Sequence, residues 1–93
     1  MADAVSHVPA GHKGAFVIER DGKRLAEMSY TSAGSKIIID HTDVSEALRG
    51  SGAGRRLVMA AVEWARAEKK TLLPLCPFAK SVFDKTPEIR DVL

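Results

Sequence analysis

The most informative part of the sequence is the segment Arg49-Gly50-Ser51-Gly52-Ala53-Gly54 together with RRLVMAAVEWARAEKK, which follows it at residues 55–70. After the glycines, apolar residues recur at helical spacing and charged residues occupy the other side. This pattern predicts an amphipathic helix of about four turns from Gly52 to about Lys69. Its apolar positions are Leu57, Val58, Ala61, Val62, Trp64 and Ala65. The glycine-rich segment is therefore predicted to be the loop that leads into a long helix.

The residues before the loop have the patterns of β-strands. Ala15 to Arg20 alternates between apolar and polar side chains, Asp21-Gly22 is typical of a tight hairpin turn, and Arg24 to Thr31 alternates again. After a second turn at Ser32 to Ser35, the segment Lys36 to His41 contains three consecutive isoleucines, which indicates a central strand buried on both faces. The sequence therefore predicts an antiparallel three-stranded meander ahead of the loop.

The residues after the long helix predict two further elements and a tail. Thr71 to Cys76 has the composition of a strand although Pro74 cannot donate to a ladder, which places it at an edge or where two strands part. Phe78 to Lys85 is predicted to be a short helix that ends at Pro87, and Ile89 to Leu93 a final extended segment. The predicted order is β-β-β-α-β-α, a mixed α/β sheet whose last strand runs parallel to the isoleucine strand.

The bulk composition limits the class of protein. The chain has 93 residues, of which 45% are hydrophobic and 28% charged, so we expect one globular domain over residues 1–93, with Met1 to Lys13 as a flexible arm. The net charge of +2 is dispersed, which argues against a nucleic-acid-binding protein. No apolar run approaches the roughly 20 residues that span a membrane, and the first residues do not resemble a signal peptide.

The number of cysteines limits which disulfides and metal sites the chain can form. Cys76 is the single cysteine, which excludes an internal disulfide and a cysteine-based zinc site. We therefore expect a cytoplasmic protein, because a lone thiol stays reduced in that compartment.

The glycine loop has a direct physical use. The first amides of a helix lack internal partners and carry partial positive charge, so glycines that let the backbone approach closely make a phosphate site there. A Walker loop needs Lys after the glycines, and Gly54 is followed by Arg55. A dinucleotide fingerprint needs a third glycine where Arg55 or Leu57 stands. What remains is the pattern Arg49-x-x-Gly52-x-Gly54 between a strand and a helix.

That pattern resembles the acetyl-CoA signature Gln/Arg-x-x-Gly-x-Gly/Ala of the GNAT superfamily of N-acetyltransferases. The order of elements from Ala15 to Leu93 is also similar to the family's order. The segments His41-Thr42-Asp43-Val44 and Leu75-Cys76-Pro77-Phe78-Ala79 look like those of a short, single-domain branch of predicted acetyltransferases. The resemblance implies a fold in which the two central parallel strands splay apart and hold the pantetheine arm of acetyl-CoA or coenzyme A.

The resemblance also implies cofactor and catalytic residues. The implied cofactor-binding residues are Val44, Arg49, Gly50, Ser51, Gly52, Ala53, Gly54, Arg55, Pro77 and Lys80. Many family members use a tyrosine on the last helix as the acid, and Phe83 stands there. Cys76, near the implied thioester, is a candidate nucleophile or acid with His41 as its base, and Glu46 is a candidate base for the acceptor. The alternatives are a buried structural cysteine, a histidine that caps a strand end and a solvated carboxylate.

The implied function is acetyl transfer from acetyl-CoA to an amine that the sequence does not identify. The tight Asp21-Gly22 turn replaces the helices that usually form the acceptor pocket, so we expect a pocket that is open or completed by a second subunit, in a monomer or a homodimer. One alternative is a coenzyme A-binding module with little or no catalysis, because the tyrosine is missing. Another is an interaction domain whose loop binds no nucleotide.

Overall fold

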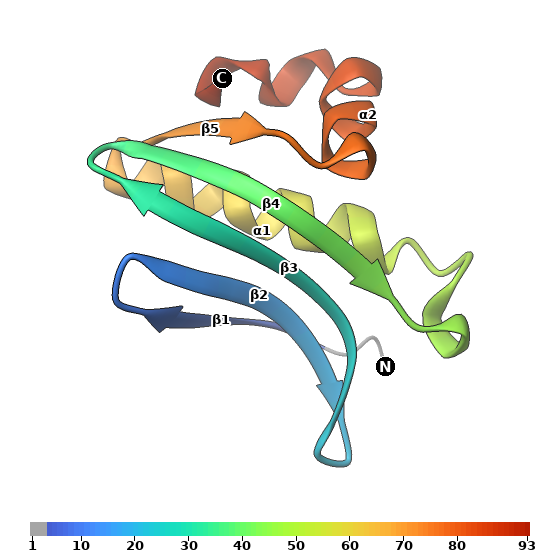
Figure 1. Cartoon of the computed structure of the whole chain (residues 1–93). Coiled ribbons are helices and arrows are strands. Elements are labelled where there is room, and N and C mark those ends of the chain that lie inside the picture. The colour runs from blue at the N-terminus through green and yellow to red at the C-terminus, as the bar shows by residue number, and fades with distance from the viewer. Residues whose placement is uncertain (1–3) are drawn as a thin grey trace.

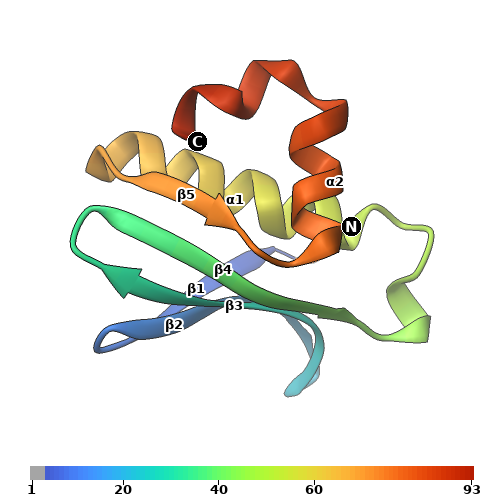
Figure 2. The same cartoon turned by 45° about the horizontal axis from the view of Figure 1, so that its top comes forward.

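The computed structural model describes residues 4–93, which form a five-stranded sheet with the order β1-β2-β3-β4-β5. Strands β1 to β4 are antiparallel neighbours, and β5 pairs parallel with β4. The elements are β1 (Val5–Ala10), β2 (Lys13–Arg20), β3 (Lys23–Ala33), β4 (Lys36–Val44), the 3₁₀ helix η1 (Glu46–Leu48), α1 (Ala53–Glu68), β5 (Thr71–Pro74), α2 (Pro77–Lys85) and the 3₁₀ helix η2 (Pro87–Val92). Both α-helices lie on the same face of the sheet (Figure 1 and Figure 2). The predicted mixed α/β fold is confirmed.

Strand β1 corrects one prediction. The expected flexible arm over residues 1–13 was wrong for Val5–Ala10, which pairs antiparallel with β2 from Val5 opposite Ile18 to Ala10 opposite Lys13. Residues 1–3 of the expected arm lie outside the described residues. Only alternate side chains of β1 are partly buried, so its composition resembles a polar tail. The strand is held by backbone pairing, which has no signature in the composition.

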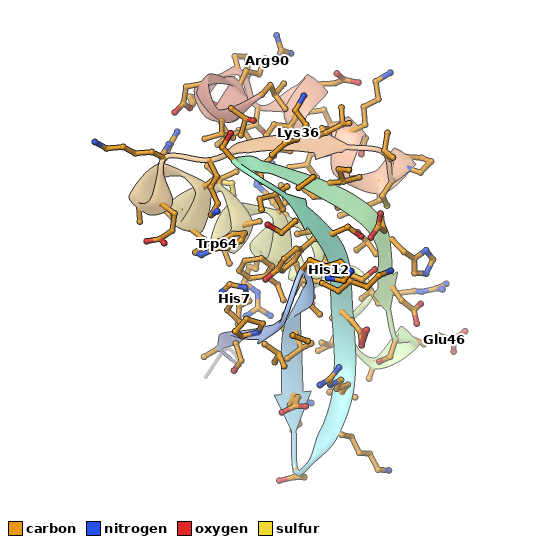
Figure 3. The ribbon with its side chains drawn as sticks, turned by 60° about the vertical axis from the view of Figure 1, so that its left-hand side comes forward. His7, His12, Lys36, Glu46, Trp64 and Arg90 are labelled. Carbon is orange, nitrogen blue, oxygen red and sulfur yellow. The ribbon has the colours of Figure 1, made fainter. Side chains whose placement is uncertain are left out.

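An aromatic cluster ties the edge strand β1 to helix α1. The His7 ring stacks on Phe16 with 4.4 Å between centroids and meets Trp64 edge-on at 4.6 Å. Its Nε2 lies 2.6 Å from the Tyr30 hydroxyl. Figure 3 shows His7 on β1 beside Trp64 on α1. His7, which the sequence placed in a loose arm, therefore belongs to the tertiary structure.

We expect acidification to weaken the fold through His7. Burial lowers the pKa of His7 below its ordinary value of 6.5, so the folded state favours the neutral ring. This contribution is complete above the unfolded-state pKa and is lost as the pH falls through the lower folded-state pKa. In urea titrations at about pH 7.5 and pH 5, the wild-type protein should lose more unfolding free energy than a His7→Phe variant. Equal losses in both proteins would contradict the assignment.

A β-bulge in β4 reverses which side chains face the helices. Ser29 pairs with His41 while the next residue, Tyr30, pairs with Ile39, so Asp40 is an extra residue in β4. Before the bulge, Ile39 is buried toward the helices. After it, Thr42 pairs with Met28 and Val44 with Ala26, both of which belong to the same core. Thr42 and Val44 therefore face the helices, and His41 and Asp43 face the opposite side of the sheet.

The last strand is shorter than predicted, because β5 ends at Pro74 and not at Cys76. The amides of Thr71 and Leu75 donate to the carbonyls of Ser35 and Ile39 of the β4 side at 2.9 and 3.1 Å, so the nitrogen of Pro74 points away from β4. Proline is tolerated there because β5 is an edge strand and no ladder hydrogen bond is lost. Beyond this point β4 continues and β5 diverges, which is the predicted splay (Figure 1).

The C-terminal tail is helical, so the predicted extended segment from Ile89 to Leu93 was wrong. Residues Pro87–Val92 form the 3₁₀ helix η2. Arg66 of α1 donates to the Asp91 carboxylate at 2.7 Å and to the Glu88 carbonyl at 2.9 Å, which holds η2 against α1. These contacts depend on the packed fold, although Pro87 at the start of the helix and Glu88 in its first turn are local helix signals. Within residues 4–93, no helix has the length and apolar character needed to cross a membrane.

Candidate functional site

The glycine loop lines a cavity of about 380 Å³, here called the loop cavity. It extends from the end of β4 across the start of α1 and along one face of α2. Its lining residues are Val44, Leu48, Arg49, Gly50, Gly52, Ala53, Gly54, Arg55, Phe78, Ser81, Val82 and Lys85. The structure therefore brings together seven of the ten residues that the sequence assigned to a cofactor, all in one cavity.

The start of α1 presents free backbone donors to this cavity. The first helical hydrogen bond runs from the Arg56 amide to the Gly52 carbonyl, at 3.0 Å. The amides of Ala53, Gly54 and Arg55 precede it and have no intrahelical acceptor. Gly52, the N-cap residue, has φ 82°, a left-handed conformation that favours glycine, and it has no side chain to cap these amides. The geometry leaves the positive end of a 16-residue helix open to an anion.

The charge of the loop cavity is positive. Arg49, Arg55 and Lys85 line it, and none of the described lining residues is a carboxylate. The Arg55 guanidinium donates to the Thr86 hydroxyl at 2.9 Å, which places this cation at the C-terminal end of α2, next to Lys85. An elongated polyanion fits this arrangement, with donors in the middle and cations near both ends.

Three of the assigned cofactor residues lie outside the lining of the loop cavity. The Ser51 hydroxyl donates to the Leu48 carbonyl and so stabilises the turn after η1. Pro77 is the first residue of α2, a position that suits its missing amide proton. Lys80 lines a second cavity of about 480 Å³ beside β5, together with Asp84. The structure therefore does not bring Lys80 to the loop cavity.

Helix α2 supplies four lining residues that the sequence analysis did not assign. Phe78, Ser81, Val82 and Lys85 follow the i, i+3, i+4, i+7 spacing of one helical face, which was the available signal. The sequence predicted this helix, but only Lys80 of it was assigned to the cofactor. In the structure Phe83 is 1% exposed in the core, while Phe78 is 41% exposed at the cavity.

Cys76 lies at the N-cap of α2, in the region where β4 and β5 diverge. Its buried Sγ is 3.4 Å from the Thr42 Oγ1, a contact that the bulge in β4 makes possible. Burial raises the pKa of the thiol, but the Thr42 hydroxyl and the amides of Ala79, Phe78 and Thr42 outweigh burial, so the pKa lies below its ordinary value. The lowered pKa favours the thiolate, which is the nucleophilic form of cysteine.

The two candidate bases lie away from Cys76. His41 is exposed on the face of the sheet opposite to Thr42, and the side chain that contacts Cys76 is that of Thr42. Glu46 is the exposed first residue of η1 and points outward at the edge of the molecule (Figure 3). The structure therefore does not bring His41 into contact with Cys76.

Among residues 4–93, no three metal-binding side chains gather in one place.

The sequence and the fold of this chain are both similar to those of known proteins. A model of the GCN5-related N-acetyl-transferase family matches residues 15–92. The solution structure of a GCN5-like N-acetyltransferase candidate from Staphylococcus aureus is 35% identical, covers 94% of this chain and 85% of its own chain, and has a TM-score of 0.72. A search of curated proteins found no match.

More distant structures share the fold. An IAA acetyltransferase from Bacillus cereus is 15% identical over 90% of this chain and 75% of its own, with a TM-score of 0.69. An aminoglycoside N-acetyltransferase in complex with CoA is 13% identical over 82% of this chain and 67% of its own, with a TM-score of 0.60. The family match, the identity with the staphylococcal protein and the shared fold together establish that this chain belongs to the GCN5-related N-acetyltransferase family and is an acetyltransferase.

Proposed function

We propose that the protein binds acetyl-CoA in the loop cavity and transfers the acetyl group to an amine. The observation that supports this most is the combination of free amides at Ala53, Gly54 and Arg55 with three cationic side chains in one cavity. Bound acetyl-CoA would supply the acetyl group as an activated thioester. The amides would hold its pyrophosphate, and Val44 would flank the pantetheine where β4 parts from β5.

Cys76 is proposed to act on the acetyl group. As a nucleophile, its thiolate would form a bond to the thioester carbonyl carbon while the bond from that carbon to the coenzyme sulfur breaks, and the coenzyme leaves as a thiolate. The amine would then attack the acetylated Cys76, release its sulfur and lose one proton. As an acid, Cys76 would instead donate its proton to the departing thiolate. In either role, Thr42 holds the sulfur in place through the 3.4 Å contact.

The face of the sheet opposite to the two α-helices, which we propose as the acceptor side, is open. The Asp21-Gly22 turn joins β2 directly to β3, and no helix of the described residues covers the second face of the sheet (Figure 2). His41 lies on that face, so we propose that it or Glu46 takes the proton of an incoming amine and that neither acts on Cys76. The amine itself is not specified by the site. We expect a monomer or homodimer in the cytoplasm, where Cys76 stays reduced.

The second candidate is a coenzyme A-binding module with little catalysis. It is favoured by the missing acid, because Phe83 has no hydroxyl and the single tyrosine, Tyr30, contacts His7 in the aromatic cluster. The family assignment favours the enzyme. The two candidates share the cofactor and differ in whether the acetyl group is transferred to an acceptor.

Thermal unfolding tests the cofactor proposal. Acetyl-CoA at about 100 times its dissociation constant should stabilise the fold by about 2.7 kcal/mol, which raises Tm by roughly 10–20 °C in a domain of this size. The charge reversal Arg49→Glu should remove most of this shift. The matched reversal Lys36→Glu, at an exposed residue of the second cavity, should keep it. No shift of the wild-type protein at millimolar acetyl-CoA would overturn the proposal.

A further inference from the structure

A small pocket, here called the β3–β4 pocket, lies where the end of β4 runs beside the first half of β3. Its volume is about 90 Å³, and the Ser45 amide joins the two strands there by donating to the Leu25 carbonyl at 2.8 Å. The pocket is lined by Arg24, Leu25, Ala26, Glu27, Asp43 and Ser45. None of these residues lines the loop cavity, so the β3–β4 pocket is separate from the proposed donor site.

The hydroxyl of Ser45 is a buried polar group without a partner. Across the described residues 4–93, its Oγ is the one buried side-chain oxygen or nitrogen that makes no hydrogen bond. Ser45 precedes η1, but its side chain does not cap that helix. An unpaired buried hydroxyl destabilises a fold, so it indicates an occupant that pairs with it. One water molecule is the simplest occupant, but the pocket is larger than the roughly 30 Å³ that a water takes up in the liquid.

The charged groups at the β3–β4 pocket leave an excess of negative charge. Glu27 and Asp43 are paired directly across β3 and β4, so both carboxylates lie on the same face of the sheet. Arg24 divides its guanidinium between Glu19 at 3.2 Å and Glu27 at 3.1 Å, and in the described part of the chain Asp43 forms no ion pair. Three carboxylates therefore share one guanidinium, which leaves a net charge of −2 in a chain whose total is +2. Like charges opposite each other destabilise a sheet, and a bound cation would offset this.

The donors and acceptors of the pocket suit an organic ammonium group. An ammonium has three N–H donors and pairs with carboxylate and hydroxyl oxygens, which the side chains of Glu27, Asp43 and Ser45 supply. A metal ion fits less well, because only two metal-ligating side chains line the pocket and no group of three occurs between residues 4 and 93.

The β3–β4 pocket lies beside the proposed path of the acceptor. His41 and Asp43 are two residues apart on the open face of β4, which separates them by about 7 Å along the strand. Beyond Ile39, β4 has no strand partner on its β5 side, so an amine near His41 can reach the proposed thioester position near Thr42 past that edge. An acceptor held by one ammonium at Asp43 would therefore place a second amine, a few carbon atoms away, near His41.

We propose that the β3–β4 pocket binds a second ammonium group of the acceptor, so that the protein acetylates short diamines and polyamines in preference to monoamines. Glu27, Asp43 and Ser45 hold the charged end, and the amine at the other end receives the acetyl group. The inference rests on the proposed function and narrows its acceptor. The bonds made and broken in the transfer are unchanged.

Acetylation of 1,4-diaminobutane and of butylamine tests this pocket, because the two amines have the same carbon chain and differ in the second ammonium group. In the wild-type protein kcat/KM should be about tenfold higher for the diamine, the factor expected of one hydrogen bond between charged groups. This ratio should fall toward one in Asp43→Asn and by a smaller factor in Ser45→Ala. Asp40→Asn, which changes an exposed carboxylate of β4 outside the pocket, should keep the wild-type ratio.

Nuclear magnetic resonance measures binding separately from turnover. Titration with 1,4-diaminobutane at low ionic strength should shift the amide signals of Glu27, Asp43 and Ser45 in the wild-type protein and leave those of Glu27 and Ser45 unmoved in Asp43→Asn. Well-dispersed spectra of the variants also show that they are folded. Missing shifts in the wild-type protein would overturn the pocket and leave water as its occupant.

The remaining outcomes separate the pocket from the proposed function. Equal kcat/KM for the two amines in the wild-type protein would overturn the pocket and leave acetyl transfer intact. A fall of the ratio in Asp40→Asn as large as that in Asp43→Asn would also overturn it, because general electrostatic attraction would then be the cause. Failure to acetylate either amine would overturn the assignment of the acceptor, and it would overturn the proposed function only if acetyl-CoA also gave no thermal shift.

Discussion

Replacing Cys76 with alanine is expected to lower kcat by about 10²- to 10⁴-fold and to leave the Kd of acetyl-CoA within about twofold. The side chain lies near the proposed thioester position, while the residues that would hold the pyrophosphate lie on the loop and α1. The measurement is release of coenzyme A thiol in the presence of a lysine peptide or a polyamine, with calorimetry for binding. Turnover that survives in Cys76→Ala would eliminate the cysteine mechanism.

Intact mass distinguishes the two proposed roles of Cys76. A nucleophile should carry one acetyl group after incubation with acetyl-CoA alone, and this mass should be missing in Cys76→Ala. An acid should show the loss of turnover without any covalent adduct. Binding without turnover in both proteins would identify the binding module as the better description.

The variant Thr42→Val tests whether the Thr42 hydroxyl lowers the pKa of Cys76. It keeps the shape of the side chain and removes the hydroxyl that lies 3.4 Å from Sγ. The pKa of Cys76 should rise, because that hydroxyl favours the thiolate, and the pH midpoint of alkylation by iodoacetamide should move upward. Thr42→Ser should restore the wild-type midpoint. An unchanged midpoint in Thr42→Val would show that the backbone amides of Ala79, Phe78 and Thr42 lower the pKa without the Thr42 hydroxyl.

The free energy of unfolding should depend strongly on Phe83, which is buried in the core. Phe83→Ala should lower the free energy of unfolding by about 3–5 kcal/mol, because it empties a fully buried position in the core. Domains of this size have roughly 5–14 kcal/mol in total, so the variant should be close to unfolding at physiological temperature. In the structure Phe83, which the sequence analysis matched to the tyrosine of other family members, is part of the core.

Phe78→Ala is the control for Phe83→Ala on the same helix. Because its ring is 41% exposed, we expect a loss of less than about 1.5 kcal/mol. Urea unfolding monitored by circular dichroism gives both values, and the slope m should be unchanged if both variants unfold from the same native state. Equal losses for the two phenylalanines would contradict the division of α2 into a core face and a cavity face.

The site was only partly predictable from the sequence. The loop and the start of α1 were identified because a phosphate site of this kind is a local feature of glycines and a helix terminus. Lys85 was missed although its helical spacing from Phe78 was readable, and Lys80 was assigned instead. Choosing between them requires the direction of α2 relative to the sheet, which the spacing within one short helix does not contain.

The succession of a meander, a glycine loop and an amphipathic helix was predictable from the sequence, because these elements depend on side-chain periods and turn residues within short windows. The remaining features depend on tertiary contacts. The extra residue Asp40 turns Thr42, and not His41, toward Cys76. Pairing with β2 makes Val5–Ala10 a strand, and Arg66 holds the helical tail against α1. Each of these results from contacts between residues distant in the chain, which a local pattern does not encode.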